Sequence, residues 1–306
     1  MANSTLLVLM QQAMQGMGVT TYALPATAVG NTNQDVTQLL ALVNMEGNAL
    51  AREYEWNALR TKYIFEATSF SYTGDVTSGS TSITNMSSIA SLDATFMVTG
   101  TGIPQDTFVT SAAATTVVIN REATTTGTTV ALTFSKCRFA YPAAFDRPVD
   151  RTEWDFTDRW EILGPKSLQE FEYLRNGYIS TGPRIRFIAI GEYFQIWPPQ
   201  GADKWFSFDY LSKYWIYATA GVATTKQYYT VDSDTCIFPD ALMHALIRLK
   251  YFQIKGFDTT LLLRDYQRQC DLAKGHDGGS QTLSMAPSVS SLLLDETNIP
   301  DSGFGS

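Results

Sequence analysis

The sequence predicts an α+β fold: a helical bundle made of one long helix and a C-terminal helical hairpin, joined to an antiparallel β-sheet region and to an inserted small all-β domain. Three observations lead to this prediction. Apolar residues recur at steps of three and four over residues 32–60 and again over 239–275, as in amphipathic helices. Short alternating runs between these segments indicate strands. Residues 69–135 are rich in threonine and contain few charges, which indicates a separate β module.

The long helix over residues 32–60 is the element around which we expect the others to pack. A short helix that begins at Ser4 and ends at Gly18 precedes it. Thr32 and Asp35 form a start that resembles a capping box. Gly47 lies within the apolar stripe and costs about 1 kcal/mol relative to alanine, so we interpret it as the point where another helix crosses closely. The stripe consists of Val36, Leu39, Leu40, Val43, Gly47, Leu50, Tyr54 and Ala58.

The inserted module follows a predicted strand over residues 61–68. Between residues 69 and 135, short β-rich runs alternate with glycine-containing turns, which is typical of a small sandwich or barrel. A disordered linker is the alternative, but the segment has enough large apolar residues for a core. They are Phe96, Val98, Ile103, Phe108, Val117, Ile119, Leu132 and Phe134. We therefore predict a core formed by residues 1–68 and 136–275, an inserted module at 69–135, and an extended tail at 276–306.

Beyond the module, the chain returns to helices and strands. Ser167 and Glu170 predict a capping box for a helix over residues 167–176. Residues 184–190 and 193–197 are predicted to form a hairpin, and residues 205–211 a third strand. The helical hairpin completes the bundle, with one helix from 239 to 256 and a second from 258 to 275.

Composition narrows the possible functions. The net charge of −8 argues against a protein that grips nucleic acid through its phosphates. Three widely spaced cysteines do not make a disulfide framework, and they favour folding in a reducing compartment. No apolar run approaches the roughly 20 residues of a membrane span, and no signal peptide is recognisable at the N-terminus. We expect a soluble protein that is made inside a cell and does not enter a membrane.

The search for catalytic chemistry is mostly negative. The two histidines, His244 and His276, do not combine with the cysteines into zinc-ligand spacing. The sequence has no phosphate-binding loop, no dinucleotide fingerprint and no G-x-S-x-G motif. We therefore expect no enzyme activity, no catalytic residues, no metal and no cofactor. Clustered acidic residues, among them Glu153 and Glu170, leave open a glycosidase-type carboxylate pair.

Two groups of residues are candidates for contacts with partners. Aromatic side chains are frequent between residues 154 and 217, and interfaces favour them, although packing in the core accounts for at least half of them. We select Trp154, Trp160, Trp197 and Trp215 as candidate interface residues. The C-terminal tail carries isolated apolar residues among Ser, Gly and Pro, which is typical of a segment that orders against a partner. Its candidates are Leu283, Leu292, Leu293, Leu294, Ile299 and Phe304.

Four segments in order resemble the head-to-tail adaptor (connector) proteins of tailed phages, in particular those beneath the portal. The resemblance covers residues 1–68 and 136–278, and its motifs are patterns of helix and turn residues. The segments are LLALVNMEGNALAREYEWNAL, AYPAAFDRPVDRTEWD, LGPKSLQEFEYLR and FPDALMHALIRLKYFQIKGFD. The inserted module (GIPQDTFVTSAAATTVVINREATTTGTTVALTF) is similar to a small β domain of phage tail proteins, and it stands where simpler adaptors have a short loop.

The resemblance implies a structural virion protein at the head–tail junction, made in the cytoplasm of the host bacterium. Such adaptors form a ring with copies of themselves, expected to number twelve, on the portal protein. The ring lengthens the DNA channel and offers a platform to a downstream nozzle or terminator protein. The family's C-terminal extension climbs onto the portal, which makes the tail the expected portal-binding segment. An acidic channel wall repels phosphates, so the DNA passes without specific binding.

Two other functions remain open on the sequence. One is a phage cell-wall hydrolase that works through paired carboxylates. The other is a tail-fibre or receptor-binding module, favoured by the β insert alone.

Overall fold

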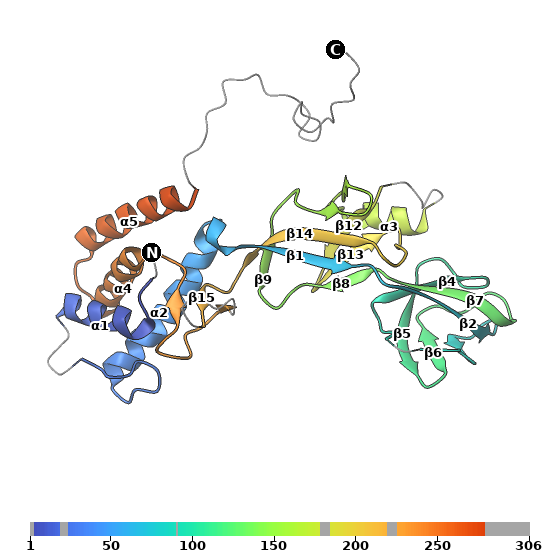
Figure 1. Cartoon of the computed structure of the whole chain (residues 1–306), viewed down its shortest axis with the longest axis horizontal. Coiled ribbons are helices and arrows are strands. Elements are labelled where there is room, and N and C mark those ends of the chain that lie inside the picture. The colour runs from blue at the N-terminus through green and yellow to red at the C-terminus, as the bar shows by residue number, and fades with distance from the viewer. Residues whose placement is uncertain (1–2, 19–23, 90, 178–183, 219–224, 279–306) are drawn as a thin grey trace, which may run out of the picture.

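The computed structural model describes residues 3–18, 24–89, 91–177, 184–218 and 225–278. Three lobes follow one another in a row: a helical lobe, a central lobe of stacked sheets, and a β-barrel at the far end (Figure 1). The predicted fold class is wrong. The described residues form mostly antiparallel sheets, one of which nearly closes into a barrel, and five α-helices. The sequence pattern overstates the helices, because helical periodicity extends over long segments, whereas most strands here are too short to show alternation.

The helical lobe buries the apolar stripes of four helices and a small sheet. The helices are α1 (Leu6–Met17), α2 (Gln34–Glu53), α4 (Asp240–Lys255) and α5 (Thr260–Gly278), and the strands are β15 (Ile216–Tyr217), β16 (Thr225–Lys226) and β17 (Thr235–Cys236). Its core includes Leu6, Leu39, Val43, Leu242 and Ile247. Gly256 has a φ of 76°, the left-handed conformation that ends α4 and allows α5 to fold back on it.

Helix α2 is shorter at both ends than predicted, and its glycine has a different neighbour. Asn33, not Thr32, caps it, since the Asn33 side chain accepts a hydrogen bond from the Asp35 N–H. The helix ends at Glu53, where Tyr54 becomes extended and the chain turns through the 3₁₀ turn η1 (Asn57–Leu59) into the sheets. None of the described helices crosses at Gly47. A β-carbon there would lie 2.1 Å from the Trp215 ring, so an indole, not a helix, makes the close approach.

The central lobe has three layers. The first is a five-stranded sheet of β1 (Arg60–Glu66), β14 (Trp205–Ser212), β9 (Phe145–Pro148), β10 (Trp154–Asp155) and β11 (Trp160–Glu161). The middle sheet contains β12 (Arg186–Ile190), β13 (Tyr193–Trp197) and β8 (Arg138–Ala140). The third layer is α3 (Leu168–Asn176).

Apolar side chains fill both spaces between these layers. Phe65 and Phe208 of the five-stranded sheet pack with Phe194 of the middle sheet. On the other side of the middle sheet, Trp197 belongs to a cluster with Phe171 of α3. Among the described residues, the middle sheet is therefore covered on both faces and the five-stranded sheet on one, and successive strand residues point to these opposite faces in turn.

The barrel comprises six strands and has a core of its own. The strands are β2 (Ser69–Val76), β3 (Ser82–Ile83), β4 (Phe96–Gly100), β5 (Thr107–Ala113), β6 (Thr116–Ile119) and β7 (Gly127–Lys136), in the order β2-β7-β4-β5-β6-β3. Asp75 and Thr84 exchange backbone hydrogen bonds of 2.8 and 3.0 Å, which bring the β3 end back to β2. Ser69 pairs with Ser135, so the two chain connections of the barrel lie side by side.

The barrel is joined to the central lobe by buried contacts. Met97 and Phe108 of the barrel lie in the same cluster as Phe171 and Trp197. Beside them, the Arg175 guanidinium of α3 pairs with the Asp106 carboxylate. The barrel therefore shares part of its packing with α3, although its main cluster lies entirely between residues 76 and 134.

Candidate interaction surfaces

The uncovered face of the five-stranded sheet carries large apolar side chains. Alternation turns Tyr63 and Phe65 inward and leaves Ile64 outward, 51% exposed. On β14, Phe206 and Phe208 point inward and Trp205 outward, 47% exposed. We call this surface the outer sheet face, and it comprises Lys62, Ile64, Glu66, Trp154, Phe156, Trp205 and Ser207.

The strand register makes the outer sheet face continuous. Ser207 is the cross-strand partner of both Ile64 and Trp154, and the Phe156 N–H donates to the Trp205 carbonyl at 2.9 Å. The Lys62 ammonium lies 4.9 Å from the centre of the Phe156 ring, a favourable cation–π distance. Ser207 is only 1% exposed beneath these side chains. Exposed apolar groups that adjoin in this way mark contact surfaces more often than single ones do.

The four tryptophans selected from the sequence divide between surface and core. Trp154 is half-buried on the outer sheet face. Trp160 is 44% exposed, with the Arg184 guanidinium 4.8 Å from the centre of its ring. Trp197 and Trp215 are buried in the described chain, at 4% and 0% exposure, where they pack between layers and against α2.

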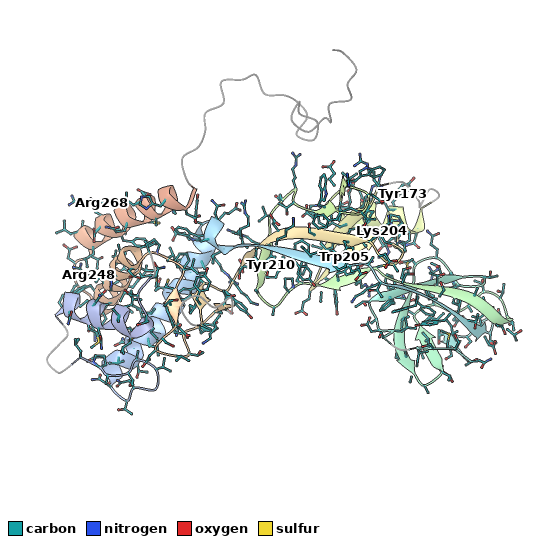
Figure 2. The ribbon with its side chains drawn as sticks, in the orientation of Figure 1. Tyr173, Lys204, Trp205, Tyr210, Arg248 and Arg268 are labelled. Carbon is teal, nitrogen blue, oxygen red and sulfur yellow. The ribbon has the colours of Figure 1, made fainter. Side chains whose placement is uncertain are left out.

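The sequence reasoning missed Ile64, Phe156 and Trp205. The sequence contains a signal for them, because apolar residues stand at consecutive positions at Tyr63–Phe65 and at Trp205–Phe206 and therefore point to both faces of the strand. A strand with one covered face needs apolar residues on that face alone. Apolar residues on the other face therefore indicate a further contact. Figure 2 shows Trp205 and Tyr173 in the central lobe, between the helices and the barrel.

A second surface lies on α3, beyond the middle sheet. Ser167 Oγ accepts a hydrogen bond from the Glu170 N–H at 3.2 Å, and the capping box is complete, as predicted. On the outer side of the helix, Leu168 and Tyr173 are 67% and 60% exposed. We call this surface the α3 face, and it comprises Lys166, Leu168, Gln169, Glu172, Tyr173 and Arg186.

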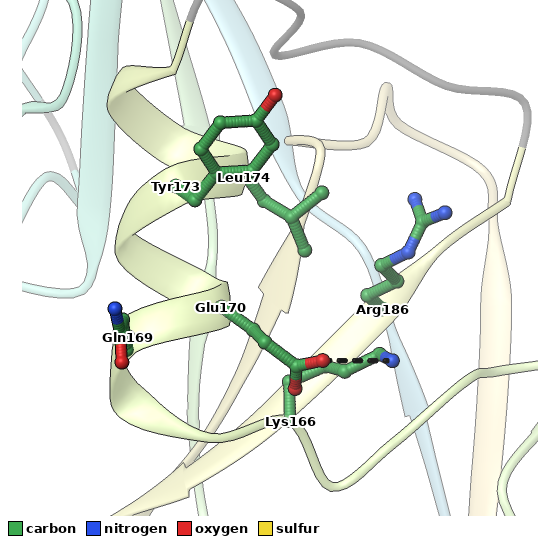
Figure 3. A pocket seen from close by; sticks show the side chains of 6 residues that line it. All are labelled: Lys166, Gln169, Glu170, Tyr173, Leu174 and Arg186. Carbon is green, nitrogen blue, oxygen red and sulfur yellow. Dashed lines mark ion pairs between the residues drawn. The ribbon is translucent and has the colours of Figure 1, made fainter.

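An open pocket of about 350 Å³ indents the α3 face. Figure 3 shows Tyr173 and Leu174 of α3 on one side of it and Arg186 of β12 on the other. Glu170 Oε1 lies 3.9 Å from the Lys166 ammonium, and a hydrogen bond from the Ser167 backbone N–H holds the pKa of Glu170 below its ordinary value. The pocket thus has an apolar wall and a rim of both charges.

The two carboxylates of the hydrolase alternative do not form a pair. Glu170 lines the α3 pocket, whereas Glu153 lines a different cavity of about 40 Å³ with Tyr141 and Phe208. A cavity of that size holds about one water molecule and no sugar ring. Glu170 is also held ionised by its cap, so it is unsuited to donate a proton.

Burial raises the pKa of the Glu153 carboxyl above its ordinary value, and the negative charge of Asp150 adds to this. The folded state therefore holds the proton more tightly than the unfolded state does. Stability is then highest below the ordinary pKa and falls as the pH rises through the raised value.

We expect Glu153→Gln to unfold at a higher denaturant concentration than the wild type at pH 7, by a margin that shrinks toward pH 4. Urea titrations across this range measure it. Glu161→Gln, at an exposed carboxylate on β11, is the control and should show no such margin. A constant difference at every pH would contradict the burial of an ionised Glu153.

The remaining candidate groups have structural contacts. His244 Nε2 lies 2.9 Å from Gln12 Oε1, and burial lowers its pKa. Across the described residues, no cluster of His, Cys, Asp or Glu side chains is suited to hold a metal ion. Within the same ranges no helix has the length and apolarity to cross a membrane.

The six tail candidates, Leu283, Leu292, Leu293, Leu294, Ile299 and Phe304, lie outside the described residues.

Comparison with known proteins assigns no family to this chain. No protein-family model matches the chain, and no curated protein matches it.

Proposed function

We propose that this protein is a structural adaptor of the head–tail junction of a tailed phage, which forms a ring beneath the portal and extends the DNA channel. The observation that carries the proposal is the pair of unlike apolar surfaces, the outer sheet face and the α3 face, on opposite sides of the central lobe. A ring subunit needs two such surfaces, because each copy contacts its neighbours through two different patches. The four sequence segments that resemble adaptors support the same assignment.

The charge and the shape of the chain agree with this role. A net charge of −8 on each copy makes a ring that repels DNA phosphates and lets the duplex slide. The helical lobe and the barrel lie at opposite ends of the molecule (Figure 1). In the proposed ring, the helical lobe is directed toward the portal, and the barrel is directed away from it, toward the downstream tail component. Negative-stain images of the protein mixed with the portal of the same phage test the proposal, which fails if no ring forms on the portal.

The tail beyond α5 is the proposed portal anchor. We expect truncation after Gly278 to weaken portal binding by at least tenfold and to leave the denaturation midpoint unchanged. Among the residues that the structure describes, the helical-lobe core extends no further than Ala273. The truncation keeps Asp277, whose carboxylate accepts hydrogen bonds from the Asn57 and Ala58 N–H groups. A direct titration against portal measures the affinity.

Two variants of the full chain test whether the leucines of the tail, and not its length, account for portal binding. Replacing Leu292–Leu294 with serine should cause most of the loss, because burial of each leucine contributes roughly 2 kcal/mol. Replacing Ser288, Ser290 and Ser291 with alanine alters the same number of positions without removing apolar groups, and should bind normally. Tight binding by the truncated protein would show that the anchor lies elsewhere.

A further inference from the structure

We propose that the outer sheet face of one copy packs on the α3 face of the next copy, and that this contact closes the ring. The inference rests on the proposed function and names the surfaces through which the copies meet.

The layer order supplies the first argument. The described central lobe runs from the five-stranded sheet through the middle sheet to α3, with apolar clusters in both spaces between layers. Its two outermost surfaces still carry large apolar side chains, Ile64 and Trp205 on one side and Leu168 and Tyr173 on the other. When the α3 of a second copy covers the five-stranded sheet, the layers continue across the subunit boundary, and each exposed face gains the kind of partner that the inner faces have.

Shape and charge supply the second argument. The outer sheet face projects Ile64 and Trp205, and the α3 face offers an open pocket of about 350 Å³ beside Tyr173. The sheet side carries both charges, in Lys62 and Glu66. The α3 pocket carries both as well, in the Glu170 carboxylate and the cations Lys166 and Arg186. A rim of mixed charges around an apolar centre is the usual anatomy of a protein interface.

The contact is between unlike surfaces, which determines what assemblies it can form. A patch that pairs with itself gives a twofold dimer and stops, whereas two different patches give a ring or a filament. Because the patches lie on opposite sides of one lobe, the first contact leaves the second patch of each copy free. Each copy therefore binds one neighbour through its sheet and another through its helix.

Cysteine crosslinking tests the contact. The native cysteines Cys137, Cys236 and Cys270 are buried, so a short bis-maleimide reacts with introduced thiols. We expect a mixture of Ile64→Cys and Tyr173→Cys copies, concentrated together, to give a crosslinked dimer of twice 33.9 kDa. A chain with both substitutions should give a ladder of larger products. Either variant alone should crosslink no more than Ile254→Cys, a control that is 55% exposed and lies on neither face.

The first pair of substitutions removes apolar side chains of the proposed contact, so a second pair of variants tests the contact with those side chains in place. Glu66→Cys and Gln169→Cys lie on the exposed polar parts of the two faces and remove no apolar group, and they should crosslink in the same mixed pattern. Crosslinking of both mixtures at the level of the control, measured on free protein and on portal-bound rings, overturns the proposal. Dimers from Ile64→Cys alone also overturn it, because they show the sheet pairing with itself.

The outcome is distinguishable from failure of the proposed function. If negative-stain images show rings on the portal and both crosslinking pairs stay at the control level, the adaptor function stands and the assigned contact is wrong. If no ring forms, the adaptor function fails whatever the crosslinks show.

Discussion

Gly47→Ala should lower the free energy of unfolding by about 2 kcal/mol, although alanine is the better helix former. The added β-carbon would lie 2.1 Å from the Trp215 ring. That ring is 0% exposed, and its Nε1 donates a hydrogen bond of 3.1 Å to Asn48 Oδ1. Tyr229 and Phe238 pack on its other sides. The indole cannot move away without breaking these contacts, so overpacking outweighs the helix-propensity gain of about 1 kcal/mol.

Urea unfolding followed by far-ultraviolet circular dichroism measures this effect in the helical lobe. Gly16→Ala, within α1, is the matched control, because a β-carbon there meets nothing within 4 Å. That control should gain up to about 1 kcal/mol. Adding Trp215→Phe to Gly47→Ala should recover part of the loss, since the smaller ring vacates the space. A stabilising Gly47→Ala would contradict the packing of the indole on α2.

Arg175→Met should destabilise the joint between α3 and the barrel by about 3 kcal/mol. The Arg175 and Asp106 side chains are 9% and 14% exposed, and their charges face each other. Arg175 also donates to Glu172 Oε1 at 3.1 Å, and its guanidinium lies 5.4 Å from the centre of the Phe108 ring. Removal of the guanidinium leaves the Asp106 carboxylate largely buried without its counter-charge, which is the costly way to break such a pair.

The double variant Arg175→Met with Asp106→Asn should recover much of this stability, because no unpaired charge remains. Asparagine suits this position, since Asp106 has a φ of 62° and asparagine tolerates the left-handed conformation. Lys204→Ala is the control. It breaks an ion pair with Asp158 whose side chains are 26% and 44% exposed, and should cost less than about 1 kcal/mol. Equal losses for Arg175→Met and Lys204→Ala in thermal unfolding would show that the joint does not depend on the buried pair.

Features that depend on neighbouring residues could be predicted from the sequence. Ser167 and Glu170 form the predicted capping box, and Gly256 ends α4 as expected. The hairpin predicted at residues 184–190 and 193–197 is formed by β12 and β13, which pair antiparallel. These features were accessible because caps, turns and periodicity are settled by groups a few residues apart.

The architecture of the central lobe could not be predicted in this way. Strand β1 pairs with β14, so that Arg60 lies opposite Leu211, and no local pattern encodes a partner so far along the chain. The candidate surfaces depend on these pairings. Trp205 is exposed and Trp197 buried because one strand belongs to a sheet covered on one face and the other to a sheet covered on both.

The sequence by itself determined the capping box at Ser167, the end of α4 at Gly256 and the acidic charge, because each arises from composition or from interactions within a few residues. Only the tertiary structure decided that an indole meets Gly47, that Arg175 meets Asp106, and that Ile64 and Trp205 face outward opposite α3. Those contacts join residues far apart in the chain, and they become definite only when the layers stack and leave each side chain a covered face or an open one.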